Sequence, residues 1–148
     1  MNWPDAEILM LFAVPPALLA LANFPAIDKY DRSSLRYVLS GAAPLPPEVA
    51  QAAARALDCT ILQGYGMTET SPVTNVNPLH RIKETSVGPP VADTVEKVVS
   101  LEDGRELGPN EVGELMVQGP QVMLGYWQRP EETAETLPGG GWIRTGDI

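Results

Sequence analysis

The feature that most constrains the fold is an unbroken apolar run over residues 8–14, which ends at Pro15-Pro16. A strand without polar residues on either face suits a parallel sheet that is covered on both sides, so we expect this strand to be buried on both faces. The two prolines can open a helix, because the first helical position does not need its N–H. The helix-forming residues 17–23 follow. The chain therefore begins with a predicted strand and helix.

The same alternation continues for two more strands. Residues 35–39 predict a strand that ends in the small residues 40–44. A helix then begins at Pro46-Pro47, and Val49, Ala53 and Leu57 give it an apolar stripe at four-residue spacing. Residues 59–62 form the next predicted strand. Strand–helix alternation of this kind is typical of an α/β fold with a parallel sheet and right-handed crossovers.

The pattern changes after about residue 73. Short alternating strands, a tight Asp-Gly turn and one short helix that begins at a proline now follow one another. The predicted strands are residues 95–99, 113–117 and 142–144, the turn is Asp103-Gly104, and the helix is residues 130–137. We therefore expect two domains, an α/β part over residues 1–74 and a small, mostly antiparallel β part over residues 75–148.

The stretch from Gln63 to Thr70, Q-G-Y-G-M-T-E-T, follows the third predicted strand directly. A ring at Tyr65 can lie on a flat base, the hydroxyl of Thr68 can donate to a phosphate oxygen, and Glu69 offers a hard oxygen ligand to Mg²⁺. The alternative is a glycine-rich turn with a helix cap and a first-turn acid. In parallel sheets ligands bind beyond the carboxyl ends of the strands, where residues 40–43 and 64–69 both lie, and this placement favours a binding site.

Composition excludes several classes of function. The 148 residues carry a net charge of −9 with no basic stripe, which argues against a nucleic-acid partner. With a single cysteine, Cys59, no internal disulfide forms, so we expect a reducing, cytoplasmic location and a core role for this residue. The longest apolar run, residues 8–22, is interrupted by prolines and too short to span a bilayer. We expect no transmembrane segment, and peripheral contact with a membrane stays open.

Four sequence motifs, taken in order, resemble those of the adenylate-forming superfamily, which includes acyl-CoA synthetases, luciferases and the adenylation domains of peptide synthetases. They are S-G-A-A-P-L at residues 40–45, Q-G-Y-G-M-T-E at 63–69, G-E-L at 113–115 with G-P at 119–120 and G-Y-W at 125–127, and G-W-I-R-T-G-D at 141–147. Within the superfamily, residues 70–78 and 120–133 look most like bacterial long-chain fatty-acid–CoA ligases. The resemblance covers about residues 8–148.

This resemblance implies a reaction in two steps. A carboxylate attacks the α-phosphorus of ATP to give acyl-AMP and pyrophosphate, and the thiol of CoA then displaces AMP. The partners implied are therefore a carboxylic acid, expected to be a fatty acid, together with ATP and CoA, with Mg²⁺ as the metal. Aryl-acid ligases share most of these motifs and remain an alternative, as does a remnant that binds nucleotide or serves as a scaffold without catalysis.

The resemblance also implies roles for individual residues. Thr68 would hold the α-phosphate, and Glu69 would bind Mg²⁺; these two form the implied catalytic set. Asp147 would accept hydrogen bonds from the ribose hydroxyls. The remaining implied nucleotide-binding residues are Gly41, Ala42, Ala43, Gln63, Gly64 and Tyr65, with Tyr65 stacked on the adenine. In the family pattern Tyr126 and Trp127 look structural, and we expect them to pack the β part.

Two family features have no counterpart in this sequence. The phosphate loop with its lysine would lie upstream of residue 8, and the lid domain with the catalytic lysine would follow residue 148. We therefore expect these residues to correspond to a middle slice of the family's large domain, and to be inactive alone.

Overall fold

The computed structural model describes residues 8–148 and divides the chain into two compact units. Unit 1 contains the residues up to Tyr65 together with residues 75–89, and unit 2 contains residues 66–74 and 90–148. The prediction of an α/β part followed by a small antiparallel β part is confirmed. The division into domains at residue 74 stays a prediction.

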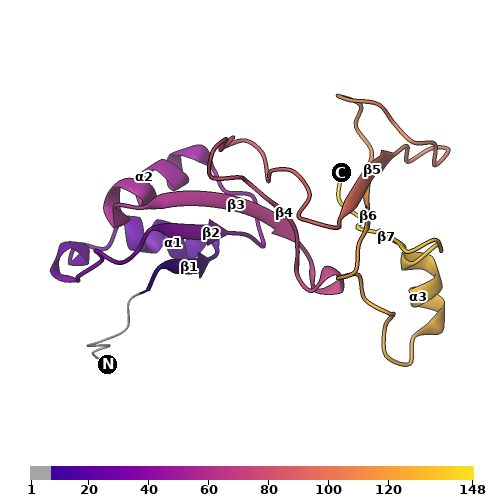
Figure 1. The fold of residues 1–148 in the computed structure, drawn as a ribbon, viewed down its shortest axis with the longest axis horizontal. Helices are drawn as coiled ribbons and strands as arrows, with labels where there is room; N and C mark the ends of the chain where they lie inside the picture. The colour runs from indigo at the N-terminus through magenta and orange to yellow at the C-terminus, as the bar shows by residue number, and fades with distance from the viewer. Residues whose placement is uncertain (1–7) are drawn as a thin grey trace. The chain divides into compact units, whose positions relative to one another are not determined.

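Unit 1 is built on a parallel sheet. The strands are β1 (Met10–Ala13), β2 (Tyr37–Ser40) and β3 (Thr60–Gly66), whose last residue belongs to unit 2. Helix α1 (Pro15–Ala22) connects β1 towards β2 by way of the short 3-10 helix η1 (Ile27–Lys29), and α2 (Pro47–Leu57) connects β2 to β3. β1 pairs with β2 and β2 with β3, both in parallel, as the strand–helix alternation predicts (Figure 1).

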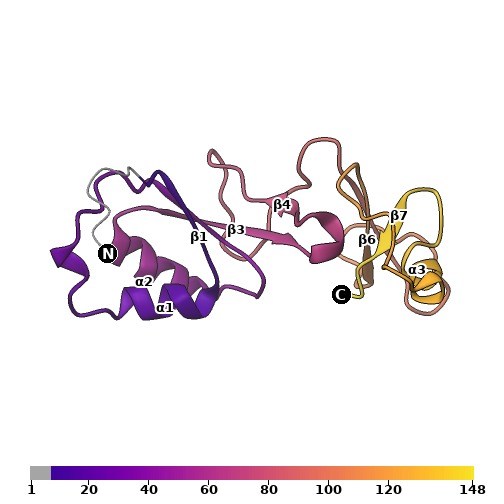
Figure 2. The same ribbon diagram turned by 90° about the horizontal axis from the view of Figure 1, so that it is seen from below.

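The core of unit 1 lies between one face of this sheet and the two helices. Figure 2 shows α1 and α2 side by side on that face. Leu11, Val38 and Ile61 are in register across the three strands; Val38 is part of the buried core, and the partly buried Leu11 and Ile61 pack against this core. Leu18 of α1 and Ala53 of α2 are completely buried against it. The apolar stripe of α2 read from the sequence is therefore the face that packs.

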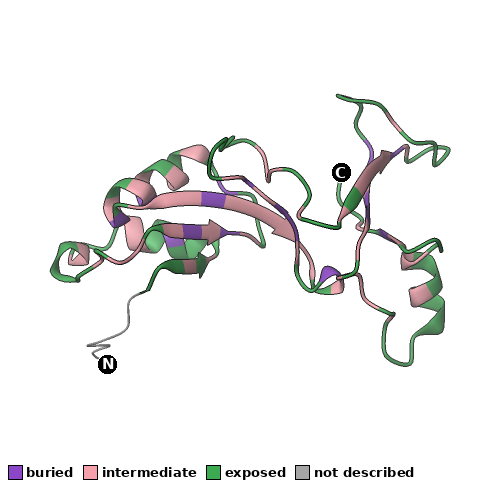
Figure 3. Cartoon of the chain, in the orientation of Figure 1, coloured by how far each residue is buried: buried purple, intermediate pink, exposed green. Residues whose placement is uncertain are grey.

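Strand β1 corrects one expectation. We predicted burial on both faces, but Phe12 is 70% exposed and Met10 39% exposed (Figure 3). Both side chains alternate with Leu11 and so lie on the sheet face opposite the helices. Within residues 8–148, the helices that follow β1 and β2 cover only the Leu11 face, and this is why the prediction was wrong.

A fourth strand, β4 (Val73–Val76), lies next to β3 in the sheet and was not predicted. The loop after it is held by Asn77, which is 2% exposed. Its side-chain amide N–H groups donate to the backbone carbonyls of Gln63 and Ser86, and its Oδ1 accepts the N–H of Lys83 at 3.0 Å. A buried amide thus organises residues 77–86 in place of regular structure.

Unit 2 contains an antiparallel sheet in the order β5 (Val95–Val99), β6 (Glu114–Gln118), β7 (Trp142–Arg144). The unit also contains the 3-10 helix η2 (Thr68–Thr70) and helix α3 (Pro130–Thr136). Its small core includes Val117 and Ile143, both completely buried. The predicted turn at Asp103-Gly104 is present, with Gly104 at φ +72° and the Ser100 N–H donating to the Arg105 carbonyl at 2.9 Å. No helix within residues 8–148 is long and apolar enough to cross a bilayer.

Candidate functional site

The small-residue loop that follows β2 lies at the carboxyl end of the parallel sheet of unit 1. A Cβ added to Gly41 would lie 3.7 Å from the carbonyl oxygen of Gly64, so this loop runs beside β3 at an ordinary contact distance. Ala42 has φ +67°, a left-handed conformation that is uncommon for a residue with a side chain. Ala42 and Ala43 are exposed. Backbone strain of this kind is often found at functional loops, and the nucleotide-binding role of residues 41–43 stays a prediction.

Gln63 ties neighbouring segments of unit 1 together. Its Oε1 accepts the backbone N–H of Leu45 at 2.9 Å, and its Nε2 donates to the carbonyl of Glu84 at 3.3 Å. The next residue, Gly64, is close to β4: a Cβ there would lie 2.8 Å from the Asn75 carbonyl oxygen. The side chain of Gln63 therefore has a structural role in addition to the predicted nucleotide contact. Tyr65 is half-buried.

In unit 2 the remainder of the motif forms the turn η2. Thr70 is completely buried, and its hydroxyl accepts the N–H of Met67 at 3.1 Å and lies 2.8 Å from the Pro72 carbonyl, to which it donates. The backbone carbonyl of Glu69 accepts the N–H of Met123 at 2.8 Å. These hydrogen bonds fix the turn, and so they also fix the backbone from which the Glu69 side chain extends. Thr68 is exposed.

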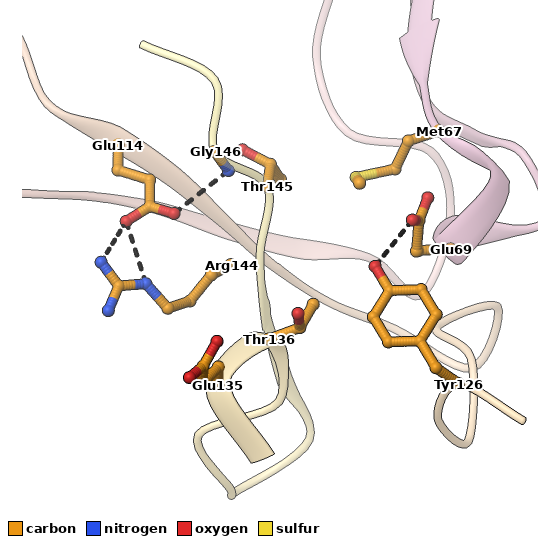
Figure 4. A pocket seen from close by; sticks show the side chains of 9 residues that line it. All are labelled: Met67, Glu69, Glu114, Tyr126, Glu135, Thr136, Arg144, Thr145 and Gly146. Atoms are coloured by element: carbon orange, nitrogen blue, oxygen red, sulfur yellow. Dashed lines mark hydrogen bonds and ion pairs between the residues drawn. The ribbon is translucent and has the colours of Figure 1, made fainter. Parts of the chain in front are cut away.

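Glu69 lines an open cavity of about 610 Å³ within unit 2 (Figure 4). The residues around it come from η2, from β6 and β7, and from the region of α3. They are Met67, Glu69, Glu114, Tyr126, Glu135, Thr136, Arg144, Thr145 and Gly146. The lining carries three carboxylates, one guanidinium, two threonine hydroxyls and one phenol, so it can offer hydrogen bonds to a polar ligand.

On one side of this cavity Tyr126 faces Glu69. The phenol donates to Glu69 Oε1 at 2.8 Å, and this hydrogen bond to a carboxylate raises the pKa of Tyr126 above its ordinary value (Figure 4). Tyr126 is 37% exposed and Trp127 is 88% exposed. The expectation that Trp127 packs the β part is therefore wrong for residues 8–148, whereas Tyr126 is only partly exposed. Tyr126 presents its hydroxyl to the implied metal ligand.

Across the cavity the buried carboxylate of Glu114 forms an ion pair with the exposed side chain of Arg144. Glu114 Oε2 accepts from Nε of Arg144 at 3.0 Å and from Nη2 at 2.6 Å, and Oε1 accepts the backbone N–H of Gly146 at 3.1 Å. Although burial opposes ionisation, the hydrogen bonds from Arg144 hold the pKa of Glu114 below its ordinary value. A two-pronged arginine–carboxylate contact of this kind fixes geometry as well as charge.

The structure brings together only part of the predicted set. In unit 2, Glu69 lines the cavity, while Thr68 and Asp147 are exposed residues outside its lining. From the sequence we expected no role at the site for Tyr126, Glu114 or Arg144. The pairs that these residues form span 57 residues for Tyr126–Glu69 and 30 residues for Arg144–Glu114, and no local sequence pattern encodes contacts at such separations.

The donor set fits a weakly held divalent cation. Within residues 8–148 no group of three or more His, Cys, Asp or Glu side chains could hold a metal ion. Mg²⁺, however, often binds through one or two carboxylates and completes its shell with water and the phosphates of a substrate. Glu69, with a carboxylate on the cavity wall, suits that mode of binding.

Comparison with known proteins identifies the family. The family described as AMP-binding enzyme matches residues 5–127. This chain belongs to that family. It is 44% identical over 141 residues to 4-coumarate-CoA ligase 2 of Narcissus pseudonarcissus, covering 91% of this chain and 25% of the relative. It is 42% identical over 135 residues to the long-chain-fatty-acid–CoA ligase of Bacillus subtilis (strain 168), covering 90% and 24%.

Solved structures agree with this assignment. The anthranilate CoA ligase AuaEII in complex with anthranoyl-AMP superposes with a TM-score of 0.86 at 27% identity, covering 93% of this chain and 26% of that protein. A long-chain-fatty-acid-CoA ligase (FadD1) from Archaeoglobus fulgidus gives 0.83 at 36% identity, covering 93% and 31%. The resemblance to the adenylate-forming superfamily is confirmed, and the chain spans about a quarter of the length of its curated relatives.

Proposed function

We propose that the complete protein is an ATP-dependent acid–CoA ligase. In the first step a carboxylate oxygen of the acid bonds to the α-phosphorus, and the bond to pyrophosphate breaks. In the second step the CoA sulfur bonds to the acyl carbon, AMP leaves with the electron pair, and the thiol proton passes to solvent. The observation that carries this proposal is the membership of residues 5–127 in the AMP-binding enzyme family, since the curated relatives reported above are named as acid–CoA ligases.

The proposal gives separate roles to the residues of unit 1. Tyr65 stacks its ring on the adenine, and the small side chains of Gly41, Ala42 and Ala43 leave room beside it. The backbone of Gly64 comes close to the acyl group. The support from the structure is local: residues 41–43 run beside β3, and Ala42 adopts a strained conformation.

In unit 2 the proposal assigns the polar contacts. Thr68 donates to the α-phosphate, Asp147 accepts from the ribose hydroxyls, and Glu69 holds Mg²⁺. The bound ion would draw charge from the phosphate oxygens and so stabilise the charge that develops at phosphorus. Tyr126, which donates to Glu69, holds that carboxylate towards the cavity. Positioning and electrostatic stabilisation of this kind account for most catalysis at phosphorus.

The acid is the finer part of the proposal. We propose a long-chain fatty acid, supported by the 42% identity to the Bacillus subtilis ligase and the likeness to FadD1. A second candidate is an aromatic acid of the 4-coumarate type, because relatives with that name reach 44% and 45% identity. ATP–pyrophosphate exchange by the complete protein, measured with fatty acids of graded length and with 4-coumarate, separates them. Exchange with 4-coumarate alone would exclude the fatty-acid assignment.

The role of Glu69 is tested by Glu69→Gln in the complete protein. We expect loss of acyl-adenylate formation and weaker binding of Mn²⁺, a spectroscopic substitute for Mg²⁺. The reason is that the substitution removes the negative charge of the carboxylate proposed to bind the metal. Glu131→Gln is the matched control, since Glu131 is an exposed acid in the first turn of α3. Metal binding and adenylation equal to those of the unsubstituted protein would refute the assignment.

A further inference from the structure

A buried carboxylate in unit 2 is bonded to the segment that carries Asp147. Glu114, the first residue of β6, is 5% exposed, and a buried charge is costly unless it is paired. Both of its oxygens are engaged: Oε2 accepts two hydrogen bonds from Arg144, and Oε1 accepts the N–H of Gly146. Glu114 therefore holds the chain immediately before Asp147.

The residue after Glu114 extends this attachment. The Leu115 N–H donates to the Asp147 carbonyl at 2.9 Å, and the Leu115 carbonyl accepts the hydroxyl of Thr145 at 2.8 Å. The Thr145 hydroxyl oxygen in turn accepts the Asp147 N–H at 3.1 Å. Residues 145–147 are thus held by two consecutive residues of β6, one through its side chain and one through its backbone.

Gly146 is the position where this support matters. Its φ is +75°, and a Cβ there would meet nothing within 4 Å, so neither a side chain nor close packing holds the backbone. Glycine has the widest conformational freedom of any residue. Among the hydrogen bonds described above, only the one that the Gly146 N–H donates to Glu114 involves Gly146 itself. By restraining the Gly146 backbone, this hydrogen bond also restrains the orientation of Asp147.

The same acid borders the cavity that contains Glu69. Glu114, Arg144, Thr145 and Gly146 all line it (Figure 4). We infer that Glu114 is a positioning residue: through Arg144 and Gly146 it orients Asp147 for the ribose hydroxyls of a nucleoside 5′-phosphate. The role of Asp147 in this inference rests on the proposed function. The attachment of residues 145–147 to β6 does not, because it follows from the hydrogen bonds alone.

A matched control lies three residues earlier in the sequence. Glu111 also accepts a glycine N–H, from Gly108 at 2.7 Å, and also pairs with an arginine, Arg105, at 3.5 Å. The Glu111 contacts are exposed and lie in the turn before β6. Glu111→Gln therefore makes the same chemical change without touching residues 145–147.

The first measurement is amide hydrogen exchange in the complete protein. In Glu114→Gln the carboxylate is lost, and we expect faster exchange at Gly146 and Asp147, with no change there in Glu111→Gln. Arg144→Lys, which keeps the charge but loses the two-pronged contact, gives a second comparison if Glu114→Gln does not fold. Unchanged exchange at Gly146 in a folded variant would overturn the inference, whatever the protein does with nucleotides.

The second measurement is AMP binding, compared with binding of 2′,3′-dideoxy-AMP. We expect Glu114→Gln to weaken AMP binding on the order of 10-fold, which is the loss expected when a charged hydrogen-bond acceptor, here Asp147, is displaced from the ribose hydroxyls. Binding of the dideoxy analogue, which lacks these hydroxyls, should stay almost unchanged. Glu114→Gln combined with Asp147→Ala should bind AMP no more weakly than Asp147→Ala alone, because coupled residues are not additive.

Equal weakening of both nucleotides, or additive effects in the double variant, would overturn action through Asp147. If Asp147→Ala alone binds AMP normally, the ribose role in the proposed function fails. The exchange measurement then still decides whether Glu114 holds the segment.

Discussion

Gly66 is a position where the addition of a single methyl group is expected to have a large effect. A Cβ at this position would lie 1.8 Å from the Pro72 carbonyl oxygen, 2.7 Å from the Pro72 carbonyl carbon and 2.8 Å from Cα of Val73. These atoms are backbone, and real Cβ contacts essentially never fall below 3.0 Å. Gly66→Ala therefore forces the chain after η2 to move by more than about 1 Å, which is more than a side-chain adjustment can relieve.

The expected cost follows from that overlap. Overpacking in a well-packed region costs about 1–3 kcal/mol, and a clash with backbone belongs at the upper end of this range. A destabilisation confined to residues 66–73 would raise local opening about 5- to 150-fold. Because η2 carries Glu69, a shift of this size would also reduce adenylation on the order of 100-fold, if the proposed function holds.

Two measurements check this prediction. Hydrogen exchange at the Thr70 amide, which donates to Met67 at 2.9 Å, reports opening of the turn, and urea unfolding reports the global stability. Gly41→Ala is the control, because a Cβ there would meet only an ordinary contact at 3.7 Å, and its φ is not in the left-handed region. We expect no destabilisation from that control. Wild-type exchange at Thr70 in Gly66→Ala would refute the steric argument.

Three further outcomes are expected. Leu18→Ala should lower the free energy of unfolding by about 2–5 kcal/mol in urea titrations, because Leu18 is completely buried; a loss below about 1 kcal/mol would contradict its core role. Glu69→Gln should lower the pKa of Tyr126, because the carboxylate that raises this pKa is removed. The absorbance of tyrosinate measures the pKa, and Tyr126→Phe identifies the part of the signal that comes from Tyr126. An unchanged pKa would disprove the contact. The pKa of Glu114 in the folded protein lies below its ordinary value of 4.5. The ionised carboxylate therefore stabilises the fold at pH values above 4.5, the ordinary pKa, and this stabilisation is lost as the pH falls through the folded pKa. The difference in unfolding free energy between the unsubstituted protein and Glu114→Gln should therefore be full at neutral pH and vanish in acid, and a pH-independent difference would count against the ion pair.

Local patterns were sufficient to predict most of the regular elements. The four-residue spacing of apolar side chains predicted α2, and the alternation at residues 95–99 predicted β5 with the bounds that the structure shows. Strand β4 was missed because Thr74 and Asn75 are polar, yet both are buried: the Thr74 carbonyl accepts the N–H of Val91, and the Asn75 side-chain amide donates to the Gly88 carbonyl. The burial of β1 was predicted wrongly, because an apolar strand does not reveal which of its faces the helices of the chain will cover.

The candidate site was predictable only in part. Glu69 could be found because a hydroxyl and an acid follow a glycine-framed aromatic at the end of a parallel strand. The partners of the site could not be found in this way. Tyr126, Glu114 and Arg144 stand within the family-like motifs, but Tyr126 reaches Glu69, and Glu114 reaches Arg144 and Gly146, only after the chain has folded.

The position of Asn77 has a consequence for the chemical durability of the protein. Asparagine is slowly converted to aspartate when the backbone N–H of the next residue attacks the side-chain amide. Here the next residue is Pro78, whose nitrogen carries no hydrogen, so this route is closed. The conversion would place a carboxylate in a 2% exposed position where an amide now donates to two carbonyls. The Asn-Pro pair thus closes this route to deamidation at the residue that holds the 77–86 loop together.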